Sequence, residues 1–239
     1  MTARPRSTTA LRVAGLDWAA LGAELDREGC VAVPDLLDDA ALRDIAALPA
    51  SPDATHALET LALGRGELRW LDALPAVLAE IRAAFHERLL PLADAWNARL
   101  GTPGRYPPAV DDALAENAPS QAAHALSSLV RLRAGDHLAL HQRDGGAGSF
   151  PFQLVALLSA PDDDFTGGEF VLTEQRPRMQ SRPIVLPLRR GDAAIIATGR
   201  RPHRGSKGDY RVSLKHAVGR VRSGERIGLE LMLHDGAAA

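Results

Sequence analysis

The sequence is poor in residues on which several protein classes depend. It contains one cysteine, Cys30, which excludes an internal disulfide framework and a thiolate metal cluster. We interpret Cys30 as a buried structural thiol in a reducing cytoplasm. No apolar run approaches the roughly 20 residues of a membrane helix. The start, MTARPRSTTALRVAG, lacks the apolar core of a secretory signal, so we expect a soluble, cytoplasmic protein with no membrane partner.

Aromatic residues are also scarce, at 4% of the chain. Proteins that hold a flipped base or a single nucleic-acid strand stack it on aromatic rings. The stretch ELRWLDALP offers only Trp70 for such stacking. The sequence therefore does not choose between a base, an amino acid and a natural-product scaffold as the substrate.

Charge is unevenly distributed, although the net charge is only −2. Between Arg176 and Arg226 there are 14 Lys and Arg residues against 3 acids, so this segment carries a net +11 and the remainder −13. A basic surface suits an anionic ligand, either a small dicarboxylate or a nucleic-acid backbone. The alternative is an ordinary solvated surface whose basic residues pair with the acidic half of the chain.

The chain divides into a helical first part and a strand-rich second part. We expect a flexible tail over residues 1–16, a helical support over 17–123 and a β-rich core over 124–239, in one integrated domain. Helical periodicity marks DWAALGAELDREG, DDAALRDIAAL and LPAVLAEIRAAFHERLLPLADAWNARLG. The last helix is expected to break or kink near Pro91 and to end at Gly101. A short apolar strand, CVAVP, follows the first helix.

From Ser127 onward the period changes from helix to strand. Short strands are predicted in SLVRLRAGDHLALHQ, PFQLVALLSA, GEFVLTE, IVLPLRRGDAAIIAT, YRVSLKHAV and RIGLELMLH. The turn sequences AGD, FTGG, RRGD and GSKGD separate them. This spacing predicts an α+β protein whose core is a sandwich or barrel of antiparallel strands.

Two histidines and an arginine occur in the order of a known kind of metal site. His141 ends a predicted strand and begins a glycine-rich loop, where a side chain can point into the mouth of a barrel. His203 lies 62 residues later, and Arg211 follows it by 8. With a carboxylate near the first histidine, this order builds the two-histidine, one-carboxylate site of non-haem iron enzymes. Arg211 would then clamp a distal carboxylate by paired hydrogen bonds.

A long part of the chain resembles a known family. The stretch DFTGGEFVLTEQRPRMQSR, with LRAGDHLALHQ before it and YRVSLKHAVGRVRSGER after it, closely resembles the prokaryotic 2-oxoglutarate/Fe(II) oxygenases predicted to act on damaged nucleic acid. The resemblance covers most of the chain from about Gly29. It implies a double-stranded β-helix (jelly-roll) core with Fe(II) and 2-oxoglutarate as cofactors. It also implies that molecular oxygen oxidises a substrate C–H bond, with release of succinate and carbon dioxide.

The chain departs from this family at the metal site itself. The family pattern is His-Gln-Asp, whereas this chain has His141, Gln142 and Arg143, with Asp144 one place late. Side chains alternate faces along a strand, so Asp144 can join His141 only if the chain turns or bulges there. The two glycines that follow make such a turn easy. We therefore predict Asp144 as the carboxylate ligand.

The second histidine is displaced as well. The family has a histidine just before an Arg-Pro pair, where Arg200 stands here, and this chain carries His203 just after Pro202. The predicted metal ligands are therefore His141, Asp144 and His203. The predicted clamp for 2-oxoglutarate is Arg211, with Lys207 and Arg220 as alternatives.

Supporting roles around the metal are predicted for His137, Gln153, His216 and Glu169. On a regular strand His137 faces the same side as His141 and could orient a ligand; the alternative is an exposed histidine. Glu169 could substitute as the carboxylate, or belong only to loop or strand-edge structure. His216 matches a family histidine and is assigned to the support of the core or pocket.

Two functions remain open. The first is an Fe(II)- and 2-oxoglutarate-dependent dioxygenase acting on damaged or methylated nucleic acid or on a small molecule. The alternative is an iron-free family member that keeps the fold and a basic cleft as a binding or regulatory module. Arg143 favours the second, because a guanidinium beside a ferrous ion adds repulsion at low dielectric. The His and Asp residues near the lost positions favour the first, which is our prediction.

Overall fold

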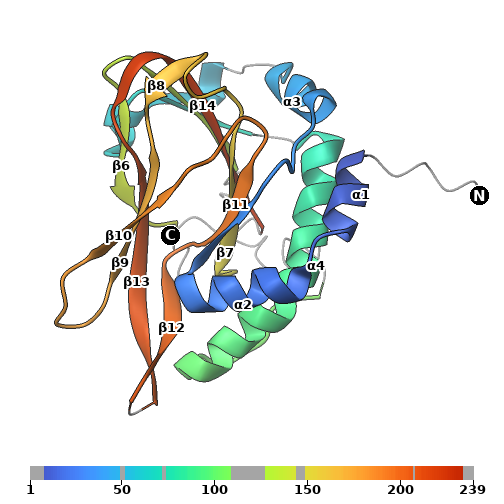
Figure 1. Ribbon diagram of the computed structural model, residues 1–239, viewed down its shortest axis with the longest axis vertical. Helices are drawn as coiled ribbons and strands as arrows, with labels where there is room; N and C mark the ends of the chain where they lie inside the picture. The colour runs from blue at the N-terminus through green and yellow to red at the C-terminus, as the bar shows by residue number, and fades with distance from the viewer. Residues whose placement is uncertain are drawn as a thin grey trace, which may run out of the picture.

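Two antiparallel β-sheets face each other in the computed structural model of the protein (Figure 1). The structure describes residues 8–48, 52–71, 74–108, 127–143, 149–206 and 208–233. The larger sheet has the order β1 (Cys30–Val33), β11 (Ala193–Ala197), β7 (Phe152–Leu157), β14 (Val221–Met232), β5 (Ser128–Arg133), β4 (Glu67–Trp70) and β2 (Thr55–Ala57), and β8 (Phe165–Gly167) pairs with β14. The smaller sheet has the order β10 (Arg182–Leu186), β9 (Phe170–Gln175), β13 (Gly208–Val218), β6 (His137–His141) and β3 (Gly64–Arg65), and β12 (Arg200–Gly205) pairs with β13.

From β5 onward the chain passes back and forth between the two sheets. Strands β5, β7, β11 and β14 lie in the larger sheet, and β6, β9, β10 and β13 lie in the smaller one. This is the arrangement of a double-stranded β-helix, in which two four-stranded sheets enclose the core between them. The predicted fold class is therefore confirmed.

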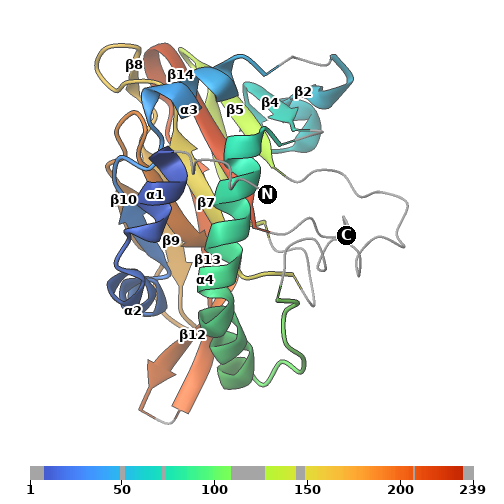
Figure 2. The same cartoon turned by 90° about the vertical axis from the view of Figure 1, so that its right-hand side faces the viewer.

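Helices cover the outer face of the larger sheet (Figures 1 and 2). They are α1 (Thr8–Ala14), α2 (Trp18–Glu28) and α4 (Ala76–Leu100), while α3 (Asp39–Ala46) follows β1, and short 3-10 helices span Pro52–Ala54 and Leu58–Leu61. The side chain of Asp17 caps the start of α2, and Gly29 ends it with a φ of 77°. Helix α4 continues through Pro91, where the sequence predicted a break or kink. No helix in the described part of the chain is long and apolar enough to cross a membrane.

The first part of the chain is more than a tail and a helical support. Residues 8–14, predicted to be flexible, form helix α1, in which Thr9 and Val13 are buried. The indole nitrogen of Trp18 donates a hydrogen bond to the Val13 carbonyl at 3.1 Å, which fixes α1 against the next helix. Strand β1 pairs with β11, β3 with β6 and β4 with β5, so this region also extends both sheets.

Part of the positive charge of the basic segment is paired with acids. Nη2 of Arg182 lies 2.6 Å from Oε2 of Glu28, and Nη1 of Arg190 lies 2.8 Å from Oδ1 of Asp39. Both acids belong to the first part of the chain, outside the segment. At these two positions the basic residues pair with acids from the acidic half of the chain, as the alternative interpretation of the charge pattern expected.

A buried ion pair joins β9 and β12 beneath α2. Arg201 donates to Glu174 through its Nε atom at 3.1 Å and through Nη2, and neither side chain is more than 1% exposed. Burial opposes ionisation of Glu174, but hydrogen bonds from Arg176 and Arg201 outweigh it and hold the Glu174 pKa below its usual value. A Cβ atom at position 29 would lie 2.8 Å from Cδ of Arg201, so glycine both ends α2 and makes room for the pair.

We expect Arg201→Met to lower the free energy of unfolding by about 3 kcal/mol, because Glu174 would remain buried with Arg176 as its main partner. The double variant Arg201→Met, Glu174→Met should recover most of this loss, since it leaves no uncompensated charge. Urea denaturation measures both. As a control, Arg190→Met, which breaks an exposed pair, should change stability by less than about 1 kcal/mol. An equal loss in the single and double variants would contradict the assignment.

Candidate metal site

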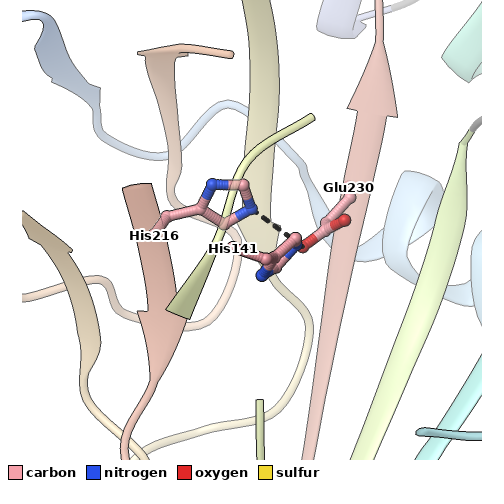
Figure 3. A group of neighbouring side chains, drawn as sticks. All are labelled: His141, His216 and Glu230. Carbon is pink, nitrogen blue, oxygen red and sulfur yellow. Dashed lines mark hydrogen bonds and ion pairs between the residues drawn. The ribbon is translucent and has the colours of Figure 1, made fainter. Parts of the chain in front are cut away.

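Three side chains from both sheets meet inside the barrel (Figure 3). They are His141 at the end of β6, His216 on β13 and Glu230 on β14. Nε2 of His216 lies 3.4 Å from Oε1 of Glu230, Nε2 of His141 lies 3.9 Å from the same oxygen, and one donor atom from each residue lies within 4.8 Å of the others. The side chains are 9%, 1% and 5% exposed, respectively. Two imidazoles and one carboxylate thus form a buried group, here called the His-His-Glu cluster.

A β-bulge turns His141 toward this cluster. His216 pairs with His141 but Val218 pairs with Leu138, so β6 has one residue more than β13 between the two pairs. The extra residue reverses the alternation of side chains, and Leu138 and His141 both face the core although they are three positions apart. His137, expected to share a face with His141, is exposed instead.

His141 is held in the tautomer that a metal ligand requires. Its Nδ1 atom lies 2.9 Å from the carbonyl oxygen of Ala139. A carbonyl can only accept, so Nδ1 carries the hydrogen and Nε2 of the neutral ring keeps its lone pair. Nε2 is buried and has no hydrogen-bond partner in the described part of the chain. Burial, helped by the nearby His216, lowers the pKa of His141 to about 4, so the ring is neutral at pH 7.

Arg143 fixes the carboxylate of the cluster. Its Nε and Nη2 atoms donate to Oε2 of Glu230 at 3.0 and 2.7 Å. Burial alone would raise the pKa of Glu230, but the charge of Arg143 and the hydrogen bond from His216 outweigh it and hold that pKa well below its usual value. Oε2 is therefore engaged by Arg143, and Oε1 faces the two imidazoles. The guanidinium also lies over the ring of Trp70, 5.1 Å from its centroid.

Two glutamines support the cluster. The Nε2 atom of Gln153, buried on β7, lies 3.4 Å from Nε2 of His216. Gln142 donates to the carbonyl of Leu214 at 2.8 Å and to Oγ of Ser213 at 2.9 Å. These bonds tie the end of β6 to β13, and so fix the segment between His141 and Arg143.

The structure does not bring the predicted ligand His203 to His141. His203 pairs with Tyr210, six residues before His216 on β13, which corresponds to about 20 Å along the strand. Its ring packs against that of Tyr210, with centroids 5.2 Å apart. The other predicted ligand, Asp144, lies outside the described residues. The structure instead places His216 and Glu230 beside His141.

The predicted carboxylate clamp is also remote from the cluster. Arg211 is exposed and lies on the face of β13 opposite to that of His216. Its Nη2 atom donates to the carbonyl oxygen of Leu100 at 3.2 Å. Arg220 is exposed in the turn after β13, and Glu169, the alternative carboxylate, is exposed before β9. Lys207 lies outside the described residues.

A different arginine, Arg226, faces the barrel interior on the same side of β14 as Glu230. It is 3% exposed, and none of the residues that the structure describes forms a hydrogen bond with its buried Nε atom. Burial lowers the pKa of Arg226 to about 10, against the opposing effect of Glu230, so the group is still charged at pH 7. Gly228 lies between the two, and a Cβ atom there would be 2.7 Å from Nη1 of Arg226.

Sequence reasoning missed Glu230 and Arg226, although a signal was present. In the stretch RIGLELML these are the only charged residues, and a charge in a buried strand needs a partner or a ligand. The stretch was interpreted only as a strand. A lone acid among apolar residues would have marked Glu230 as a candidate.

The buried neutral state of His141 predicts a pH dependence of stability in the metal-free protein. The unfolded ring has a pKa near 6.5 and the folded ring one of about 4, so the unfolded chain binds a proton that the fold excludes. Stability should therefore fall as the pH drops from about 6.5 to 4, by about 3 kcal/mol from this group. His141→Gln should lose less stability over this range in urea titrations with chelator present. Identical losses in the two proteins would contradict the assignment.

Comparison with known proteins places the fold and the cluster in context. A family model described as "Oxygenase, catalysing oxidative methylation of damaged DNA" (Oxygenase-NA) matches residues 66–236. Two relatives are the uncharacterized proteins Rv2227 and MT2286 of the Mycobacterium tuberculosis strains H37Rv and CDC 1551. Each is 38% identical to the chain over 164 residues, which are 69% of this chain and 70% of the relative.

Solved structures share the fold at low sequence identity. An oxidoreductase of the 2OG-Fe(II) oxygenase family from Burkholderia pseudomallei superposes with a TM-score of 0.52 at 18% identity, over 94% of both chains. A prolyl 4-hydroxylase from Phytophthora capsici gives a TM-score of 0.55 at 14% identity, over 99% of this chain and 68% of that one. With a family model that matches most of its length, the chain belongs to the Oxygenase-NA family of oxygenases, built on the fold of the 2OG-Fe(II) oxygenases.

Proposed function

We propose that the protein is an Fe(II)- and 2-oxoglutarate-dependent dioxygenase whose metal ligands are His141, His216 and Glu230. The observation that carries this proposal is the His-His-Glu cluster. Two neutral imidazoles and one carboxylate are the donor set of non-haem Fe(II) oxygenases. The unpartnered Nε2 atom of His141 also fits a metal, because an unsatisfied buried acceptor is costly and coordination would satisfy it.

Arg143 is compatible with this role for Glu230. It engages Oε2 and leaves Oε1 directed at the imidazoles, so the carboxylate is oriented as a ligand bound through one oxygen. Carboxylates that bind metals are commonly held by hydrogen bonds from neighbouring groups. In this proposal Glu230 takes the place that the sequence assigned to Asp144.

Arg226 is proposed to pair with the distal carboxylate of 2-oxoglutarate. It is a buried cation whose Nε atom has no hydrogen-bond partner among the described residues, and it lies on the same face of β14 as Glu230, with its guanidinium over Gly228. Guanidinium groups bind carboxylates through two parallel hydrogen bonds. Bound iron and 2-oxoglutarate would supply the activation of oxygen and the oxidation of a substrate C–H bond. The side chains of the protein would orient the iron and the 2-oxoglutarate and would exclude water from around them.

Nucleic acid is the candidate substrate that the family description supports, because it names damaged DNA. The only aromatic ring in contact with Arg143 among the described residues is that of Trp70, which is half-buried. An aromatic ring at this position could stack on a base, but it could equally pack against a small molecule. The proposal therefore extends to both substrate classes.

A second candidate function is the iron-free binding or regulatory module. The specific observation in its favour is the contact of Arg143 with Glu230, which already neutralises the carboxylate. Because a guanidinium beside a divalent ion is repelled by it, the pair could stabilise the fold without metal. Metal titration separates the two functions.

Titrated anaerobically with Fe(II), the full-length chain should bind about one ion, as measured by calorimetry. Glu230→Gln should weaken this binding by about 100-fold or more, since it replaces a charged ligand with a neutral amide. Glu169→Gln, an exposed acid before β9, serves as the matched control and should bind normally. Absence of Fe(II) binding in the wild type together with binding in Arg143→Asp would instead establish the iron-free module.

Arg226→Met should weaken 2-oxoglutarate binding to the Fe(II)-loaded protein by roughly 30-fold while Fe(II) affinity changes little, because the clamp acts on the distal carboxylate. Calorimetric titration of each ligand measures this. Arg211→Met is the control, and its 2-oxoglutarate affinity should equal that of the wild type. A loss in Arg211→Met but not in Arg226→Met would return the clamp to the residue predicted from the sequence.

A further inference from the structure

A pocket of about 600 Å³ lies at the end of the barrel formed by β8, the start of β9 and the end of β10. Its walls are mainly apolar and include Leu157, Phe165, Phe170, Val185, Leu186 and Leu188. Val185 is 55% exposed, an unusual exposure for a large apolar side chain that lines a cavity. Pockets of this size and character hold small organic ligands.

Arg226 also lines this pocket. Among the described residues its Nε atom has no hydrogen-bond partner, and the charge of Glu230 acts on it without an ion-pair contact. Two glycines make room for it: a Cβ atom at Gly168 would lie 3.0 Å from Cδ of Arg226, and one at Gly228 would lie 2.7 Å from Nη1. A buried guanidinium whose Nε–H has no partner among the described residues is costly, so its place beside a cavity indicates an anionic ligand.

The other charges of the pocket lie at its rim and nearly cancel. Arg189 and Arg190 are exposed there, and Arg190 is already paired with Asp39 at 2.8 Å. Asp162 and Glu169 are exposed as well. Within the pocket lining, Arg226 is thus the buried charge, surrounded by apolar walls.

We propose that this pocket is a second ligand site, which takes an organic monoanion with an apolar body, such as a medium-chain or aryl carboxylate. The acid group pairs with Arg226, and the apolar body lies against Phe165, Phe170 and Leu188. A dianion fits less well, because Arg226 is the buried cation among the described lining residues, and Arg189 and Arg190 lie exposed at the rim. The site itself does not require metal at the His-His-Glu cluster.

The two ligands that Arg226 serves are expected to compete. The pocket ligand approaches from the outer end of the barrel, and 2-oxoglutarate would lie on the side of Glu230, but one guanidinium supplies the charge for both. This consequence rests on the proposed function, whereas the pocket site does not. An amphipathic carboxylate would therefore inhibit the oxygenase by occupying its clamp.

Calorimetric titration of the full-length chain, without added metal, with octanoate and with 1-octanol tests the site. Octanoate should bind, and octanol should bind at least about 30-fold more weakly because it lacks the charge that Arg226 compensates. Arg226→Met should weaken octanoate binding by a similar factor, whereas Arg178→Met, an exposed arginine outside the pocket, should leave it unchanged. Equal binding of the acid and the alcohol, or equal effects of the two arginine variants, would overturn the proposal.

A second variant guards against a folding defect in Arg226→Met. Val185→Trp changes an exposed wall residue and leaves Arg226 in place, and it should weaken octanoate binding by filling the pocket. Glu230→Gln, which removes a proposed metal ligand, should retain octanoate binding or tighten it. Loss of octanoate binding in Glu230→Gln would overturn the independence of the pocket site, whereas failure of Fe(II) to bind the wild type bears only on the proposed function.

Discussion

The charge of Glu230 is the constraint on which the interior of the barrel depends. A carboxylate taken out of water loses several kcal/mol of solvation, which only well-placed partners offset. Here the partners come from the opposite sheet: Arg143 follows β6, and His216 lies on β13. The two sheets are therefore joined by polar contacts at this level, where an ordinary sandwich would have apolar packing. Any movement of one sheet against the other would expose an uncompensated charge.

The same constraint explains why Arg143 is tolerated beside a candidate metal site. The family pattern places an acid at this position, two residues after the histidine, and this chain has a cation there. Glu230 supplies an acid from β14, directly across the barrel, so the pair carries no net charge. Arg143 without Glu230 would repel a cation, and Glu230 without Arg143 would be held less firmly. The presence of each residue is therefore explained by its ion pair with the other.

Periodicity predicted most elements of the fold but not the detail that builds the site. Alternating apolar residues located the core strands, and capping residues such as Asp17 and Gly29 located helix ends, because these signals are local. The bulge that turns His141 inward depends on the register of β6 against β13, which no local pattern contains. For this reason His137 does not share a face with His141, and the alternative of an exposed histidine describes it.

The choice of partners for His141 shows the same limit. His203 was preferred because it stands near the family position in the sequence, yet the hairpin of β12 and β13 carries it away along the strand. His216 was assigned to the support of the core or pocket, and its position beside His141 follows only from strand pairing. Glu230 could have been suspected from its apolar surroundings, whereas its pairing with Arg143 joins residues 87 positions apart.

Strand β14 places one positive and one negative side chain in the barrel interior, and this arrangement bears on the order in which metal and 2-oxoglutarate would bind. Arg226 and Glu230 lie on one face of β14, with Gly228 between them and the Arg226 guanidinium over it, so a cation and an anion follow each other along the strand. A keto acid whose distal carboxylate pairs with Arg226 would bring its other carboxylate toward Glu230. Like charges at close range in a low-dielectric interior repel strongly. In the proposed function, a metal ion held by Glu230 would offset this repulsion, so we expect the metal to bind before 2-oxoglutarate.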